Sequence, residues 1–167
     1  MDFHPDIIVT DDGLPRVRLV VEVRAVPIDG ETAWTEHDRE LAAYMTRQGA
    51  HTALVVQPGR ARVYREKFAA DATTPPGTGR VAPIAVDVVA DIDTSAVRQL
   101  QPRTGEQWQY ASAVQAWLEH LPIRSNRASL TGPLREAVER ELMPELWGGD
   151  IRAAGPRGPE WYHLRAG

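Results

Sequence analysis

The chain has 167 residues, of which 43% are hydrophobic and 25% charged, and this composition is ordinary for one globular domain, so we expect a single domain over residues 1–167. No apolar run approaches the ~20 residues that span a membrane, the first residues lack the basic and apolar regions of a secretory signal, and no cysteine is present for disulfides or thiolate metal sites. A formal net charge of −4 argues against general affinity for polyanions but leaves room for a local basic groove. We therefore expect a cytoplasmic protein without a membrane partner.

Two apolar runs open the chain, at residues 7–10 and 17–25, and the turn pair Asp12-Gly13 between them predicts an antiparallel β-hairpin. Successive residues of a strand face opposite sides of a sheet, so Glu22 and Arg24 point the same way. Glu22 stands inside an otherwise apolar run. Burying a charge costs several kcal/mol unless a partner compensates for it, so the sequence raises the question of what compensates Glu22.

A helix is predicted next, capped by Thr35 with Asp38 and ended by Gly49. Residues 51–57 then form a short apolar strand, and residues 61–66 form the returning strand of a second hairpin. The helix is expected to turn one face toward the sheet, made of Trp34, His37, Leu41, Tyr44, Met45 and Gln48.

The middle of the chain is less regular. Residues 67–80 are rich in Ala, Thr, Gly and Pro and predict an exposed loop, whereas residues 81–93 are apolar enough for a strand or for a segment that crosses the core. Thr104 and Gln107 are expected to cap an amphipathic helix that ends near Pro122.

A third helix is predicted to begin around Gly132-Pro133 and to stop before Pro144, and residues 160–164 offer one more strand. The order of these elements predicts an α/β or α+β domain with a central mixed sheet. Residues 1–66 form its β-β-α-β-β core, and residues 81–167 complete the fold with mixed and helical segments.

Two acidic residues on neighbouring strands suggest a metal site. Asp6 opens the first apolar run and Glu22 lies in the second, so their carboxylates converge if both point to the same side of the sheet. Mg²⁺ (or Mn²⁺) prefers hard oxygen ligands and is typically held by one or two protein carboxylates. A metal held in this way activates water and stabilises charge in a phosphodiester displacement, and a nearby cation such as Arg24 would assist.

The residues Pro5-Asp6, fifteen intervening residues and Glu22-Val23-Arg24 resemble the PD-(D/E)XK signature of the restriction-endonuclease-like superfamily. The order of elements over residues 5–66 resembles that superfamily as well. The resemblance implies an α/β fold with a mixed β-sheet flanked by helices, and a Mg²⁺-dependent nuclease acting on DNA. It implies that Asp6 and Glu22 bind the metal, and that Arg24 takes the place of the lysine that assists the attacking water. Many relatives of this fold act as dimers, so a homodimer is also open.

Two features depart from that pattern. Arg24 cannot act as a base, since its pKa lies above ~12, and its fork is larger than an ammonium group. Only four residues precede Pro5, where the superfamily usually places a helix and a strand. Either the recorded start of the sequence is late, or a C-terminal piece such as residues 161–164 or the helix at 108–121 fills that place. Glu106 or Glu119 would then supply an additional acid.

Three other interpretations stay open. The chain is also compatible with a catalytically silent member of this fold, kept as a binding or assembly module, and with an unrelated α/β protein. In the simplest case Glu22 makes an ion pair with Arg18 or Arg24 on a solvated face, worth ~0–1 kcal/mol. For His37 and Gln57 we expect structural roles, in packing and in a turn, ahead of a role as ligands.

Overall fold

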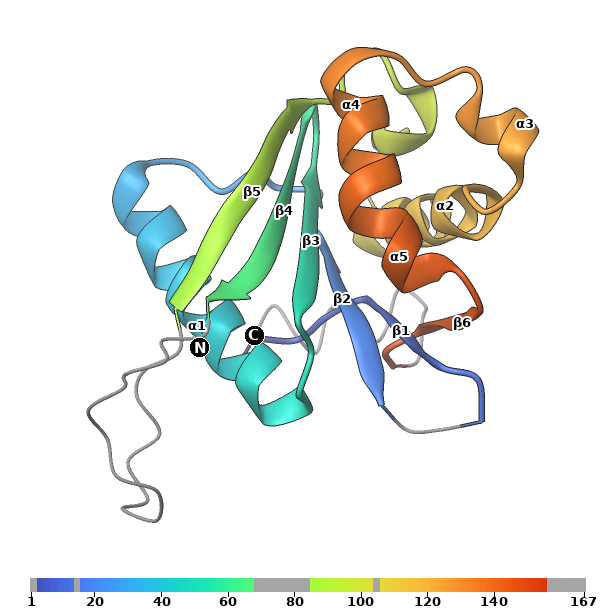
Figure 1. The fold of residues 1–167 in the computed structure, drawn as a ribbon. Helices are drawn as coiled ribbons and strands as arrows, with labels where there is room; N and C mark the ends of the chain where they lie inside the picture. The colour runs from blue at the N-terminus through green and yellow to red at the C-terminus, as the bar shows by residue number, and fades with distance from the viewer. Residues whose placement is uncertain (1–2, 14–15, 68–84, 104–105, 156–167) are drawn as a thin grey trace.

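The structure, a computed structural model, describes residues 3–13, 16–67, 85–103 and 106–155. These residues form a mixed α/β fold, in which a six-stranded sheet is flanked by helices (Figure 1). The strands follow the order β5-β4-β3-β2-β1-β6 across the sheet. Their bounds are β1 Ile7–Asp11, β2 Val17–Val23, β3 Thr52–Gln57, β4 Arg60–Lys67, β5 Ala85–Asp93 and β6 Gly149–Ala153.

The sheet is built around one parallel strand pair. β1 and β2 form the expected antiparallel hairpin, in which Ile7 lies opposite Val21. The chain then crosses through α1 (Glu31–Gln48) and returns as β3, which runs parallel to β2 and pairs Glu22 with Val55. A parallel pair requires such a crossover, and a helix is its usual form. β4 and β5 extend the sheet as antiparallel neighbours on one side, and β6 closes the other side against β1.

The helices lie in two layers, one on each side of the sheet (Figure 1). α1 covers one face. The other face carries η1 (Arg98–Leu100), α2 (Gln107–His120), α3 (Arg124–Arg127) and the continuous helical segment formed by α4 (Gly132–Ala137), η2 (Val138–Leu142) and α5 (Met143–Leu146).

Alternation along the strands sends side chains into two separate apolar cores. In β2, Val20 packs in the core beneath α1, whereas its neighbours Leu19 and Val21 pack in the core beneath the C-terminal helices. Because both faces are covered, β2 is apolar at every position except Arg18 near its start and Glu22 near its end.

Several expectations are confirmed. The hairpins and the strand within residues 81–93 are present, and so is the inward face of the first helix, except at Gln48, which is exposed. α1 ends at Gly49, whose φ of 67° lies in the left-handed region that glycine adopts at low cost. Residues 161–164 and most of the predicted 67–80 loop lie outside the described residues.

The predicted helix caps are wrong. α1 begins at Glu31, so Thr35 lies within the helix, where its hydroxyl donates to the carbonyl of Glu31 at 2.9 Å. A hydroxyl one turn into a helix satisfies itself in this way without marking the start. α2 begins at Gln107 itself, and its side chain bonds to another part of the fold instead of capping the helix. Thr104, the other residue of that predicted cap, lies outside the described residues.

The third helix does not stop before Pro144. It runs on to Leu146 because η2 is a π-helical turn and Pro144 falls in the first turn of α5, where a missing N–H is tolerated. The chain then forms β6, which the sequence pattern did not predict, since its alternation is short and carries Asp150 and Arg152. No helix in the described part of the chain is both long and apolar enough to cross a membrane.

Candidate functional site

Glu22 points from β2 toward α1, into the interface between sheet and helix. Its neighbours Val21 and Val23 belong to the core on the opposite face, which fixes the direction of the Glu22 side chain by alternation. Only 9% of Glu22 is exposed. A carboxylate at this depth requires partners, and the structure identifies them.

Both carboxylate oxygens of Glu22 are engaged. Oε2 accepts a hydrogen bond from Nε2 of His37, which projects from α1 and is itself buried. Oε1 accepts from Nη1 of Arg24 at 3.1 Å. The expected common direction of Glu22 and Arg24 is therefore confirmed, and so is an ion pair with Arg24. The face is not solvated, however, and Arg18 instead pairs with Asp11.

His37 carries a positive charge in this arrangement. Burial alone would lower its pKa, but hydrogen bonds to Asp38 and Glu22, together with the charges of both carboxylates, raise the pKa of His37 to about 9. Its Nδ1 lies 3.4 Å from Oδ1 of Asp38, and its ring packs edge-on against Phe3 and Trp34. The buried charge of Glu22 is thus compensated by two cations, one directly after its own strand and one from α1.

Asp6 lies beside this network at the start of β1. It is 5% exposed, and its Oδ2 accepts a hydrogen bond from the backbone N–H of Val23 at 2.8 Å. Its backbone N–H donates to the carbonyl of Val21 at 2.9 Å, and its carbonyl accepts from the N–H of Ala154 at 3.0 Å. The fold therefore brings the Asp6 carboxylate to the peptide bond directly after Glu22, at the point where β1, β2 and the end of β6 meet.

The chemistry of this donor set decides whether a divalent cation fits. Asp6 and Glu22 offer the hard oxygens that Mg²⁺ prefers, but a cation bound to Glu22 would lie next to the guanidinium of Arg24 and the protonated ring of His37. Among the described residues, no group of three or more histidine and acidic side chains is placed to hold a metal. As arranged, the residues do not fit Mg²⁺.

The additional acids expected from the second half of the chain do not join the site. Glu106 accepts a hydrogen bond from the indole of Trp108 at 2.6 Å, and Glu119 accepts one from Gln115 at 2.7 Å. Both carboxylates therefore have local partners on α2 and its start, and neither belongs to a metal-binding group in the described part of the chain.

Arg24 retains donor capacity beyond its pair with Glu22. Its Nε is buried and has no hydrogen-bond partner among the described residues, while 38% of the side chain is exposed. The guanidinium therefore reaches from the buried network to the surface of the protein. An arginine in this position is suited to hold a carboxylate in place and to meet an anion from outside.

Two glutamines hold the end of β2 and the segment that leads from it to α1, and the sequence did not reveal this role for either. Gln107 accepts from the N–H of Ala25 at 2.7 Å and donates to the carbonyl of Val23, which ties α2 to the strand. Gln57, buried at the end of β3, accepts from the N–H of Ile28 at 3.1 Å. Local sequence patterns contain no signal for a contact between residues 82 positions apart. His37 differs, because a polar residue on an apolar helix face can be recognised in the sequence.

Comparisons with models of known protein families, with curated proteins and with solved structures find no match for this chain.

Proposed function

We propose that this chain is a catalytically silent descendant of the restriction-endonuclease-like nucleases, retained as a binding or assembly module. The observation that carries the proposal is the pairing of both Glu22 oxygens with His37 and Arg24 inside the sheet–helix interface. The antiparallel hairpin, the crossover helix α1 and the parallel strand β3 support the relationship, since the signature residues lie where these elements meet.

The charge balance is the physical reason for expecting silence. In a metal site the two carboxylates would repel each other until a cation bound between them. Here the negative charge of Glu22 is already offset by Arg24 and by His37, whose pKa is raised to about 9. A divalent ion would have to displace or approach two positive groups, at an electrostatic cost that the buried position increases.

Thermal unfolding at pH 7 tests the proposal. We expect millimolar Mg²⁺ or Mn²⁺ to leave the melting temperature unchanged and DNA to remain uncut, because no metal is bound. Glu22→Gln is expected to lower stability, since it leaves His37 and Arg24 with a neutral partner. The control is Glu36→Gln, an exposed residue on α1, which should change little. A Glu22→Gln variant that melts higher than the wild type would contradict the proposal.

A second function, a Mg²⁺-dependent nuclease acting on DNA, is favoured by one observation. Asp6 is held against the peptide bond after Glu22, so two buried carboxylates remain close to the half-exposed Arg24. This function requires Glu22 to leave its present partners when a metal binds. A metal-dependent rise in melting temperature of the wild type, absent from both Asp6→Asn and Glu22→Gln, would establish it in place of the first.

Arg24→Lys separates the two functions further. Lysine would restore the residue of the signature. It would also remove the guanidinium, and with it the hydrogen bond from Nη1 to Glu22 and the buried Nε that has no partner among the described residues. Metal-dependent DNA cleavage by this variant but not by the wild type would show that arginine suppresses activity. Loss of a cleavage activity present in the wild type would show that Arg24 has its own role in the reaction. No cleavage by either protein is the outcome that the silent module predicts.

A further inference from the structure

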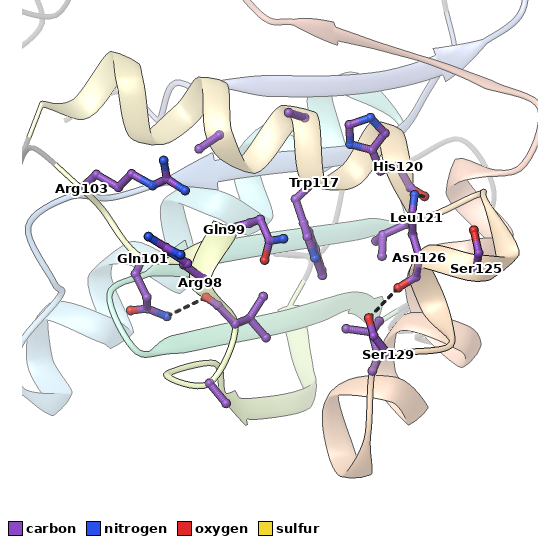
Figure 2. Close-up of a pocket in the computed structure, with 15 residues that line it drawn as sticks. Arg98, Gln99, Gln101, Arg103, Trp117, His120, Leu121, Ser125, Asn126 and Ser129 are labelled. Atoms are coloured by element: carbon purple, nitrogen blue, oxygen red, sulfur yellow. Dashed lines mark hydrogen bonds between the residues drawn. The ribbon is translucent and has the colours of Figure 1, made fainter.

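A cavity of about 860 Å³ lies on the other face of the sheet, away from Glu22 and α1. It is bounded by α2, by the segment around η1 and by the turn that leads from α2 through α3 (Figure 2). Its volume is in the range of sites that enclose small organic ligands. No residue of the Glu22 network lines it, so it is a separate feature of the molecule.

The titratable side chains that line the cavity are all basic. They belong to Arg98, Arg103 and His120, and no acidic side chain of the described residues lines it. None of these three side chains makes a hydrogen bond or ion pair with another described residue. On the same side of the sheet, two other arginines do have acidic partners, because Arg65 pairs with Glu141 and Arg127 pairs with Glu139. In a protein with a net charge of −4, this cavity collects unpaired donors for an anion.

The floor between these donors is apolar. Trp117 extends from α2 into the middle of the cavity and is 8% exposed, with the buried Leu121 beside it (Figure 2). Arg98 and Arg103 lie at one end of the cavity, and His120, Asn126 and Ser129 lie at the other. The arrangement offers a charged end, an apolar middle with an indole ring, and a polar end.

We propose that this cavity binds a small organic phosphate of the nucleotide class. The two arginines would take the phosphate, because guanidinium groups match its oxygens in pairs and a phosphate monoester offers more charge than a carboxylate. The flat apolar body would lie over Trp117 and Leu121, and its polar edge would reach the serine and asparagine end. The proposal concerns a different site from the Glu22 network and stands whether or not that network binds metal.

Isothermal titration of the full chain with AMP tests the proposal, with adenosine and inorganic phosphate as separate probes. We expect one AMP per chain, and adenosine and phosphate each binding at least about tenfold more weakly, since each offers one half of the ligand. The double variant Arg98→Gln/Arg103→Gln should weaken AMP binding by about tenfold or more. Both arginines are exposed, so its melting temperature should match that of the wild type.

The matched control is Arg39→Gln/Arg135→Gln, which removes two exposed arginines from outside the cavity. It should bind AMP as the wild type does, and an equal loss there would show that the effect is only net charge. Absence of AMP binding at millimolar concentration, or binding that the cavity variant retains, would overturn the proposal. If inorganic phosphate binds as tightly as AMP, the claim that the cavity recognises the organic body of the ligand is overturned. A single-stranded oligonucleotide binding far more tightly than AMP, in an Arg98- and Arg103-dependent way, would make the site a nucleic-acid surface instead.

Discussion

The two faces of the sheet differ in whether their charged side chains have partners within the protein. Beneath α1, the carboxylate of Glu22 is buried and neutralised by His37 and Arg24 within hydrogen-bond distance. Beneath the C-terminal helices the core is built mainly from apolar side chains. Arg98 and Arg103 stand at the rim of a cavity on this side, and the described residues of its lining include no acidic side chain.

The two sides of the sheet therefore differ in what they offer to a ligand. Paired charges in a buried interface contribute specificity and little net stability, and they are satisfied without a ligand. Unpaired cations around an apolar floor are not satisfied by the protein itself. The signature residues thus lie on the face where the protein compensates its own charges, and the face without a signature is the one that offers donors to a ligand.

The largest effect is expected from removing one member of the buried network. His37→Ala should lower the free energy of unfolding by about 3–5 kcal/mol, because it leaves the Glu22 carboxylate buried beside only one cation. Urea denaturation measures this loss. The double variant Glu22→Leu/His37→Leu removes both charges and should recover most of it. Equal losses in the two variants would show that packing of the ring, not charge, is what matters on this face.

The face of the sheet beneath α1 should also give the protein a pH-dependent stability, which the face beneath the C-terminal helices should not. The pKa of His37 is about 9 in the folded protein and 6.5 in its ordinary state, so the folded chain binds more protons between these values. Its contribution to stability is complete below pH 6.5 and is lost as pH rises through 9, a decrease of a few kcal/mol. Denaturation across this range, compared with His37→Gln, measures it. Parallel curves for the two proteins would contradict the prediction.

Beneath the C-terminal helices, a steric change should lower the free energy of unfolding, and this loss should not depend on pH. An added Cβ at Gly149 in β6 would lie 2.6 Å from Cγ1 of Val9 and 3.0 Å from the backbone carbonyl of Glu145. Gly149→Ala should therefore lower the free energy of unfolding by about 1–3 kcal/mol, because β6 must shift away from α5. The exposed Ala154→Ser serves as control. An unchanged melting temperature would show that β6 is not held closely against β1 and α5.

The smallest effect is expected at the surface of the first face. Asp91 on β5 pairs with Arg60 at 2.5 Å and with Arg62 at 3.0 Å, and 37% of its side chain is exposed. Hydrogen bonds from Arg60, with the nearby Arg62, lower the pKa of Asp91 below its usual range. Asp91→Asn should cost less than about 1 kcal/mol, because water screens exposed pairs. A loss as large as that of His37→Ala would show that burial does not separate these pairs.

Much of the first half of the fold could be predicted from the sequence. Periods of two and of three to four residues are local properties, and they were enough to predict the hairpins, the end of the first helix at Gly49 and its inward face. The same periodicity placed Glu22 and Arg24 on one side of their strand, which the hydrogen bond between them confirms. The predictions of the first helix cap and of the end of the third helix were wrong, because Thr35 and Pro144 are compatible with more than one position in a helix.

Local patterns in the sequence were enough to predict most elements of the first half of the chain and a charge within an apolar strand, but not β6. The pairing of that charge with His37 depends on tertiary packing, because His37 lies on a separate element and a helix can dock with several faces and registers. The same holds for Gln107, for β6 beside β1 and for the cavity around Trp117. Contacts between distant segments depend on how whole surfaces pack together, and no local spacing of residues encodes that choice.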